Sequence, residues 1–129
     1  MSSEEKLAIY LDPLDLGSWE FHPEIGSTND RALAWAHHGA TDWSLVVADA
    51  QITGRGRAGR TWITKPGAAL ALSLVLRPTE EEEEFMPRFS ALAALALVDA
   101  LENLGLTGMV KWPNDILLKG RKMAGVLVE

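Results

Sequence analysis

"WSLVVADAQITGRGRAGRTWITKPGAALALSLVLRP", residues 43–78, is the stretch that decides the fold. Its two ends, residues 43–50 and 68–78, are apolar runs of β-compatible residues, which predict strands that are buried on both faces or lie at the centre of a sheet. Between them, residues 53–62 hold three arginines and three glycines. The sequence therefore predicts a basic, glycine-rich loop that is pinned between two buried strands.

The sequence before this stretch predicts a strand and a helix. Residues 19–21 indicate a short strand, and residues 23–26 a turn. Ser27 or Thr28 then begins a helix of about three turns, because a serine followed three residues later by an acid is typical of a helix N-terminus.

The sequence after this stretch predicts a long helix and three strands. The five glutamates at 80–84 favour a solvated loop or a helix entrance. Residues 88–105 have the period of a helix with a wide apolar stripe that lies across a sheet. Residues 107–129 read as three strands with turns at 112–115 and 119–122, an antiparallel meander. The predicted fold class is α+β.

Composition limits the classes of function. The chain has 129 residues, which matches one domain, predicted over residues 18–129 after an N-terminal segment at 1–17. It contains no cysteine, which excludes disulfides and thiolate metal sites. The acidic N-terminal segment lacks the pattern of a signal peptide or a membrane span, so we expect a cytoplasmic protein with no membrane partner. A net charge of −6 argues against general affinity for nucleic acid.

Positive charge is nevertheless concentrated in the arginine loop. Residues 50–79 contain no acid. Glycines let the backbone come close to a ligand, and guanidinium groups bind carboxylate or phosphate through paired hydrogen bonds. The spacing G-x-G-x-x-G is present, but Pro66, Gly67 and a predicted strand follow it, so neither a dinucleotide fingerprint nor a Walker loop is predicted. The alternatives are a solvated basic loop and an RGG-like tether to nucleic acid, and the flanking buried strands and Trp62 argue against a disordered tether.

A second polar group occurs in "KWPND" (111–115). Lys111 can lie near a phosphate, Asn114 can hydrogen-bond a base or a phosphate oxygen, and a single aspartate beside phosphates, Asp115, is a typical anchor for Mg²⁺. An Asx turn that caps the backbone is the alternative. Lys122 lies at a predicted turn into the last strand, where a surface lysine is also a common reading.

Four motifs together resemble the biotin protein ligases. These are "STN" (27–29), "QITGRGRAGRTW" (51–62), "KWPND" (111–115) and "KMAGVLVE" (122–129), and their order and intervals also agree with that family. The resemblance runs from about Ser18 to the last residue. It implies an α+β fold of the class II aminoacyl-tRNA synthetase and biotin ligase type, with a mixed, mainly antiparallel sheet backed by helices.

The resemblance also implies a reaction. Such ligases join biotin to ATP, giving biotinyl-5′-adenylate and pyrophosphate, and pass biotin to a lysine of a biotin carboxyl carrier domain of a carboxylase. Mg²⁺ is the implied metal, with Asp115 as its anchor. The implied catalytic residues are Lys122, Lys111 and Arg57. The implied biotin-binding residues are Ser27, Thr28, Asn29, Gln51, Gly54, Arg55 and Lys122. The implied ATP-binding residues are Arg57, Arg60, Trp62, Lys111 and Asn114.

Several further expectations follow from the resemblance. Arg57, Arg60, Lys111 and Lys122 are expected to converge on one pocket. Related chains continue beyond "GVLVE", so we expect this sequence to cover only the front part of the domain. With few residues before Trp19 we expect no helix-turn-helix and no DNA binding, and a homodimer stays open. The alternatives are a lipoate-type ligase on the same fold and an inactive fragment that keeps biotin affinity.

Overall fold

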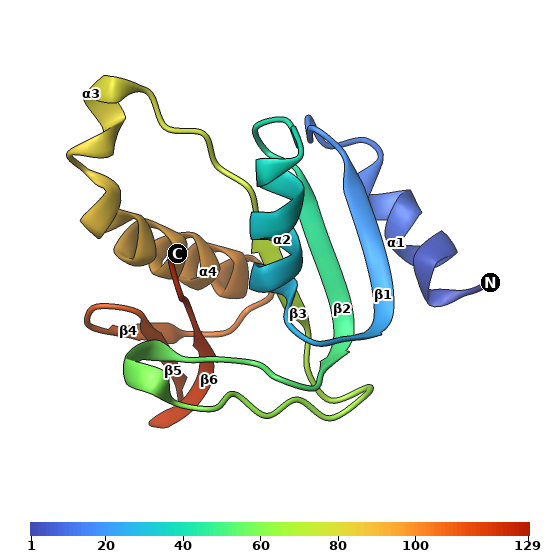
Figure 1. Cartoon of the computed structure of the whole chain (residues 1–129). Coiled ribbons are helices and arrows are strands. Elements are labelled where there is room, and N and C mark those ends of the chain that lie inside the picture. The colour runs from blue at the N-terminus through green and yellow to red at the C-terminus, as the bar shows by residue number, and fades with distance from the viewer. The chain divides into compact units, whose positions relative to one another are not determined.

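The computed structural model describes residues 1–129, and the chain folds into two compact units (Figure 1). Unit 1 comprises residues 1–55 and 60–77, and unit 2 comprises residues 56–59 and 78–129. The arginine loop is thus divided, because its central residues 56–59 belong to unit 2 and its two ends belong to unit 1.

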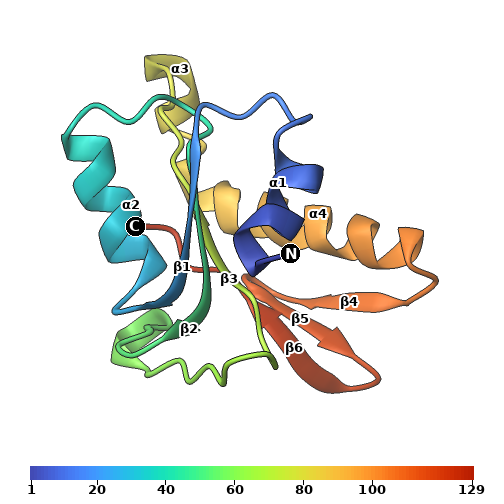
Figure 2. The ribbon, with the colours of Figure 1, turned by 90° about the vertical axis from the view of Figure 1, so that its right-hand side faces the viewer.

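Unit 1 is a three-stranded sheet with two helices. Its elements are α1 (Ser3–Leu11), β1 (Trp19–Ile25), α2 (Thr28–His37), β2 (Leu45–Gln51) and β3 (Ala71–Leu74). The strand order is β1-β2-β3, with β1 parallel and β3 antiparallel to β2. Figure 2 shows α2 on one side of this sheet and α1 on the other.

The central strand β2 is buried on both faces, as predicted. Its residues Val46 and Ala48 have no exposed surface. Val46 forms a core cluster with Ala32 of α2 and with Val75, and Trp35 of α2 packs against this cluster. Burial of this kind stabilises by about 25 cal/mol per Å² of apolar surface removed from water. The prediction of a strand buried on both faces is therefore confirmed for residues 43–50. It is wrong for residues 68–78, because β3 is an edge strand that buries Ala71 and Ser73 but leaves Leu72 exposed on its other face.

Strand β1 corrects the predicted turn at residues 23–26. The strand continues through Pro23 to Ile25, and His22 and Glu24 pair with β2 on either side of the proline. Because β1 is an edge strand, the missing N–H of Pro23 faces away from the ladder and costs no hydrogen bond.

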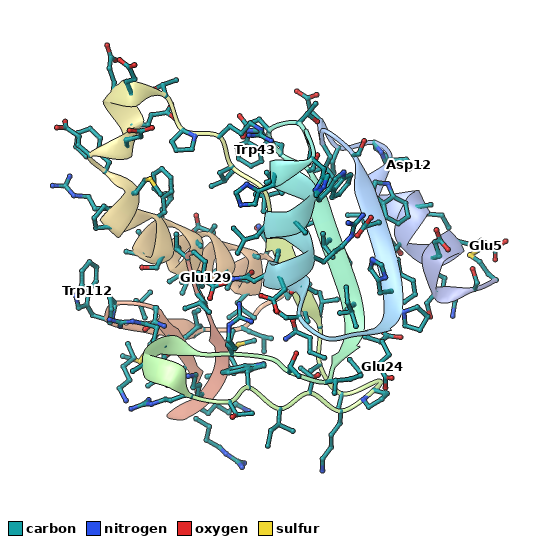
Figure 3. All side chains as sticks on the ribbon, viewed as in Figure 1. Glu5, Asp12, Glu24, Trp43, Trp112 and Glu129 are labelled. Carbon is teal, nitrogen blue, oxygen red and sulfur yellow. The ribbon has the colours of Figure 1, made fainter.

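The N-terminal segment contains a helix that the sequence analysis did not predict. Helix α1 begins with a capping box, in which Ser2 accepts a hydrogen bond from the Glu5 amide and the Glu5 carboxylate accepts one from the Ser2 amide. At the other end, Trp19 Nε1 donates to Asp12 Oδ1 over 2.8 Å. Asp12 is labelled in Figure 3 beside the end of α1. This bond links α1 to the start of β1.

Unit 2 packs a long helix on an antiparallel meander. Its helical elements are η1 (Arg57–Gly59), α3 (Glu80–Glu83), η2 (Met86–Arg88) and α4 (Phe89–Asn103). Its strands are β4 (Gly108–Lys111), β5 (Asp115–Leu118) and β6 (Arg121–Gly125), in the order β4-β5-β6. The predicted helix at 88–105, the meander and the helix entrance at the glutamate run are confirmed.

The core of unit 2 lies between α4 and its sheet. Ala94 and Leu101 of α4 pack on Ile116 of β5, which has no exposed surface, and Val98 and Val110 pack against them. α4 is an apolar helix of 15 residues. No helix in the structure combines the length and the apolar character needed to cross a membrane. One mixed and one antiparallel sheet, each with helices packed on it, give the α+β fold that the sequence predicts.

Candidate functional site

The first group of predicted site residues surrounds the start of α2. It consists of Ser27, Thr28, Asn29, Gln51, Gly54 and Arg55 and is called the α2 cluster below. Ser27 is the N-cap, because its Oγ accepts a hydrogen bond from the Asp30 amide over 3.2 Å, which confirms the predicted helix start. Ser27 and Thr28 are buried. All six residues belong to unit 1.

Gln51 holds the first turn of α2 from the end of β2. Its Oε1 accepts a hydrogen bond from the Thr28 amide over 2.7 Å and from the Thr28 hydroxyl over 3.0 Å. The backbone N–H of Gln51 in turn donates to Thr64 Oγ1 over 2.6 Å. The end of β2 and the start of α2 are therefore joined through side chains, which fixes the polar groups that face this end of the sheet.

Gly54 is needed for a close backbone approach. The amide of Trp62 donates to the Gly54 carbonyl over 2.8 Å. A Cβ added at Gly54 would lie 2.5 Å from the Trp62 carbonyl oxygen and 2.9 Å from Gln51 Nε2. Only a residue without a side chain fits there. Gly54 thus brings the start of the arginine loop against Gln51.

The ends of the arginine loop are joined by a short antiparallel bridge between Arg55 and Thr61. The Arg55 guanidinium lies 2.9 Å from Asp30 of α2. Arg60 is exposed, next to this bridge. Arg55, Arg60 and Trp62 therefore stay with the α2 cluster in unit 1.

The second group of predicted site residues gathers at one end of the sheet in unit 2. It consists of Arg57, Lys111, Asn114, Asp115 and Lys122 and is called the β5 cluster below. Lys122 Nζ lies 3.0 Å from Asp115 Oδ1. Lys111 is the cross-strand partner of Asp115 in the β4–β5 ladder. Arg57 also reaches this end of the sheet, through its hydrogen bond to Asn114. Three cations therefore lie around the Asp115 carboxylate and the Asn114 side-chain amide.

Asn114 connects Arg57 to the last strand. Arg57 Nη1 donates to Asn114 Oδ1 over 3.3 Å, and Asn114 Nδ2 donates to the Val126 carbonyl over 2.9 Å. The neighbouring Trp112–Pro113 peptide bond is cis. The Trp112 side chain projects from the turn into solvent and is 73% exposed (Figure 3). The central part of the loop forms only the three-residue turn η1, in which Ala58 has a φ of 55°, and not the helix of a dinucleotide fingerprint.

Three of the four cations expected to converge on one pocket lie near one another in unit 2, but of these three only Arg57 lines the pocket there. Arg57, Lys111 and Lys122 lie at the β5 cluster. Arg60 belongs to unit 1, and its convergence with them stays a prediction.

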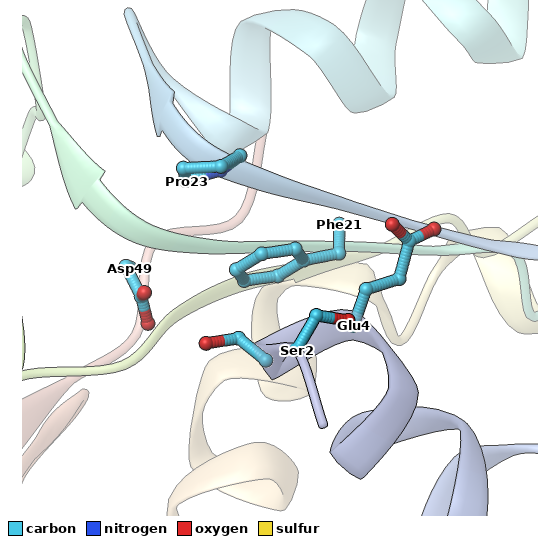
Figure 4. A pocket seen from close by; sticks show the side chains of 6 residues that line it. Ser2, Glu4, Phe21, Pro23 and Asp49 are labelled. Carbon is cyan, nitrogen blue, oxygen red and sulfur yellow. The ribbon is translucent and has the colours of Figure 1, made fainter.

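Each unit also contains an open pocket. In unit 1, a pocket of about 250 Å³ lies between the start of α1 and strands β1 and β2 (Figure 4). Glu4 and Asp49 line it beside Phe21, so its charge is wrong for an anionic ligand. In unit 2, a pocket of about 260 Å³ lies beside Arg57 and has Pro87, Pro113 and residues 126–128 in its walls. Arg57 is the one charged residue that lines it.

The side chains of the β5 cluster offer few ligands for a metal ion. No group of three or more His, Cys, Asp or Glu side chains is arranged to hold a metal ion. Asp115 supplies one carboxylate, and its Oδ1 is paired with Lys122. Mg²⁺ often takes one or two protein carboxylates and completes its shell with phosphate oxygens and water. The chain therefore fits an ion that arrives with a nucleotide better than a resident one.

An ion pair beside the α2 cluster fixes the helix on the sheet. Arg31 of α2 donates to both carboxylate oxygens of Glu20 in β1, over 2.6 and 3.0 Å. These hydrogen bonds lower the pKa of Glu20 below its usual value, and the same pair raises the pKa of Arg31. The Glu20 carboxylate also contacts His22 Nε2 at 2.8 Å.

Ser73 of β3 is a residue of this region that the sequence reading missed. It is buried, and its Oγ donates to Thr28 Oγ1 over 2.8 Å and also contacts Asn29 Oδ1. A serine at the centre of an apolar strand was the only available signal, because a buried hydroxyl needs a partner. The partner lies 45 positions earlier in the chain, which the sequence does not reveal.

The chain matches the model of the biotin/lipoate A/B protein ligase family over residues 22–129. It is 40% identical over 110 residues to the bifunctional ligase/repressor BirA of Bacillus subtilis, covering 84% of this chain and 34% of that protein. It is 38% identical over 112 residues to the biotin–[acetyl-CoA-carboxylase] ligase of Mycobacterium tuberculosis, covering 82% of this chain and 42% of that protein.

Solved structures agree with these relatives. The biotin protein ligase from Aquifex aeolicus in complex with biotin and ATP superimposes with a TM-score of 0.76 at 33% identity, covering 87% of this chain and 46% of that one. The chain therefore spans between about a third and a half of the length of the relatives it matches.

Proposed function

The chain belongs to the biotin/lipoate A/B protein ligase family, and from this membership we propose that it takes part in the ATP-dependent adenylation of biotin and its transfer to a protein lysine. The observation that carries the proposal is the β5 cluster. Arg57, Lys111 and Lys122 come from three separate parts of the sequence and gather around Asn114 and Asp115. Such a concentration of cations in an acidic chain suits anionic substrates.

The first step joins two anions. A biotin carboxylate oxygen attacks the α-phosphorus of ATP, and the bond from that phosphorus to the bridging oxygen breaks, so that pyrophosphate leaves with the electron pair. Positioning and electrostatic stabilisation supply most of the acceleration in such a step. We assign Lys122 and Lys111 to the charge that builds up between carboxylate and phosphate. Asp115 forms an ion pair with Lys122, and an arriving anion would compete for that lysine.

The α2 cluster is the proposed biotin site. Ser27, Thr28 and Gln51 carry the hydrogen-bonding groups for the ureido ring, and Asn29 adjoins them. Gly54 allows the backbone at Arg55 to approach the biotin carboxylate. Support comes from burial of Ser27 and Thr28 and from the bonds that hold Gln51 against Thr28. Groups that are fixed before binding lose little entropy when a ligand arrives.

ATP is assigned to the arginine loop and the β5 cluster. Arg57 and Arg60 would bind phosphate oxygens, Trp62 would pack at the adenine and Asn114 would contact the nucleotide. Mg²⁺ bound with ATP would neutralise phosphate charge, and Asp115 is the carboxylate proposed to hold it. Each charge-assisted hydrogen bond of this kind contributes about 1.5–3 kcal/mol.

The second step transfers biotin to a partner protein. The neutral amine of an acceptor lysine attacks the carbonyl carbon of the adenylate, AMP leaves, and the amine loses a proton. The proposed partner is a biotin carboxyl carrier domain of a carboxylase. A homodimer, the absence of a nucleic-acid partner and a cytoplasmic location stay predictions, the last supported by the need for ATP.

The test is detection of the adenylate. The 129-residue chain is incubated with biotin, ATP and Mg²⁺, and biotinyl-5′-AMP and pyrophosphate are measured by mass spectrometry and a coupled assay. We expect both products with biotin and neither with lipoate. Lipoyl-AMP would favour the lipoate-type alternative, and biotin binding without pyrophosphate release would indicate a binding fragment.

A charge variant tests the role of Lys122 within that assay. Lys122→Ala is expected to lower adenylate formation by roughly 10²–10³, the usual effect of removing one preorganised stabilising group. The matched control is Lys65→Ala, since Lys65 is an exposed lysine outside both clusters. Near-normal adenylate formation by Lys122→Ala would contradict the assignment.

A further inference from the structure

Hydrogen-bond directions around Thr28 can be deduced from the donors alone. A backbone N–H can only donate, so the Gln51 atom that lies 2.7 Å from the Thr28 amide must be its carbonyl oxygen. That oxygen can only accept. The Thr28 hydroxyl, 3.0 Å from the same oxygen, must therefore donate its single proton to Gln51.

The contact between Thr28 and Ser73 then has only one possible direction. Thr28 has no second proton to give, so the Ser73 hydroxyl donates to Thr28 Oγ1 over 2.8 Å. Both residues are at least nine-tenths buried, so water does not compete readily for these groups. The Ser73 hydroxyl also contacts Asn29 Oδ1, an oxygen that can only accept, so Ser73 shares its single proton between two residues of the α2 cluster.

We propose that Ser73 is a positioning residue that holds the Thr28 hydroxyl as a hydrogen-bond acceptor for a ring N–H of the ligand. The Thr28 hydroxyl donates its proton to Gln51 and accepts a hydrogen bond from Ser73. The one remaining lone pair on Thr28 Oγ1 can only accept a hydrogen bond from a ligand. Gln51, whose oxygen is used by Thr28, turns its Nε2 toward Gly54 and offers a donor. A cyclic urea carries the matching N–H and carbonyl groups.

This inference rests on the proposed function only for the identity of the ligand. The bonds from Ser73 to Thr28 and from Thr28 to Gln51 are formed by groups of the protein alone. Loss of Ser73 would leave the Thr28 hydroxyl able to turn, and would remove the donor that buried Thr28 Oγ1 shares with the half-buried Asn29. The expected consequence is weaker binding of biotin with unchanged handling of ATP.

The experiment compares Ser73→Ala with Ser44→Ala, a matched change of a fully buried serine in the same unit. Titration calorimetry with biotin should show about tenfold weaker binding for Ser73→Ala, equivalent to about 1.4 kcal/mol, and wild-type binding for Ser44→Ala. The KM for ATP should not change. If Ser73→Ala does not fold, Ser73→Cys, which is somewhat larger and carries a weaker donor, serves instead.

A double-mutant cycle shows whether Ser73 acts through Thr28. Thr28→Val removes the hydroxyl and keeps the shape. In that background, Ser73→Ala should cause no further loss of biotin affinity. The same tenfold loss in both backgrounds would overturn the proposal.

Hydrogen exchange separates this inference from the proposed function, because it needs no ligand. The Thr28 amide, bonded to Gln51, should exchange faster in Ser73→Ala and at the wild-type rate in Ser44→Ala. If wild-type protein fails to bind biotin but Ser73→Ala shows faster exchange, only the ligand assignment fails. Unchanged exchange at Thr28 in Ser73→Ala would overturn the positioning role of Ser73.

Discussion

Replacing Gly54 by alanine should damage the α2 cluster through a single methyl group. The added Cβ would lie 2.5 Å from the Trp62 carbonyl oxygen, a distance at which something must move. This oxygen is part of the Trp62 backbone, whose N–H is hydrogen-bonded to the Gly54 carbonyl. Moving it would therefore strain or break that hydrogen bond. The side-chain amide of Gln51, whose Nε2 would lie 2.9 Å from the same Cβ, can move more easily and would be displaced from its place against Thr28.

The expected size of this effect follows from those contacts. Overpacking of a well-packed site costs about 1–3 kcal/mol of folding free energy. Displacing Gln51 would weaken one or two hydrogen bonds, each contributing about 0.5–1.5 kcal/mol, so biotin affinity should fall by roughly tenfold. Urea unfolding and titration calorimetry measure the two quantities separately.

Gly39→Ala is the control for this substitution. Gly39 follows the C-cap of α2, has a φ of +94°, and has no neighbour within 4 Å of an added Cβ. Alanine there should cost roughly 1–2 kcal/mol of stability through backbone strain and leave biotin affinity unchanged. The reasoning would be refuted if Gly54→Ala kept both wild-type stability and wild-type biotin affinity, because the loop would then have room for a side chain.

Two further perturbations test the packing and the electrostatics. Ile116→Ala should lower the free energy of unfolding, measured in urea, by about 2–5 kcal/mol, because it creates a cavity at a fully buried position under α4. The control is Met109→Ala at an exposed position, which should change the free energy of unfolding by less than about 0.5 kcal/mol. Glu20→Gln should cost roughly 1 kcal/mol at neutral pH. Since the folded pKa of Glu20 is lowered, wild-type stability should fall as pH drops from the unfolded value near 4.5 through the folded pKa, and the variant should lose that part of the dependence. Equal acid dependence in both proteins would contradict the role of Arg31.

The parts of the fold that the sequence predicts are those with a strong local signal. β2 is a run of apolar β-branched and small residues and proved to be buried on both faces. α4 is a run of fifteen residues rich in alanine and leucine, which have high helix propensity. Ser27 satisfies the first amides of α2 through its own side chain, so its role depends on neighbours three positions away. Local patterns such as these need no knowledge of distant contacts.

The parts that sequence reasoning missed depend on neighbours in space. Pro23 continues β1 only because its side of the strand is a free edge. α1 has no buried residue, and it is held by a capping box at its start and by a bond from Trp19 to Asp12 at its end. Ser73 gains its role from residues of α2 that lie more than forty positions away. The sequence motifs predict which residues belong to the α2 and β5 clusters. The contacts within each cluster, such as Gln51 with Thr28 and Lys122 with Asp115, are seen only in the structure.

The most direct test of the proposed division of labour is biotin-dependent exchange of labelled pyrophosphate into ATP by two variants. Thr28→Val, in the α2 cluster, should raise the KM for biotin about tenfold or more and leave the KM for ATP unchanged. Arg57→Ala, in the β5 cluster, should raise the KM for ATP by a similar or larger factor and leave the KM for biotin unchanged. Equal effects of both variants on both substrates, or no effect of either, would contradict the assignment of biotin to one cluster and ATP to the other.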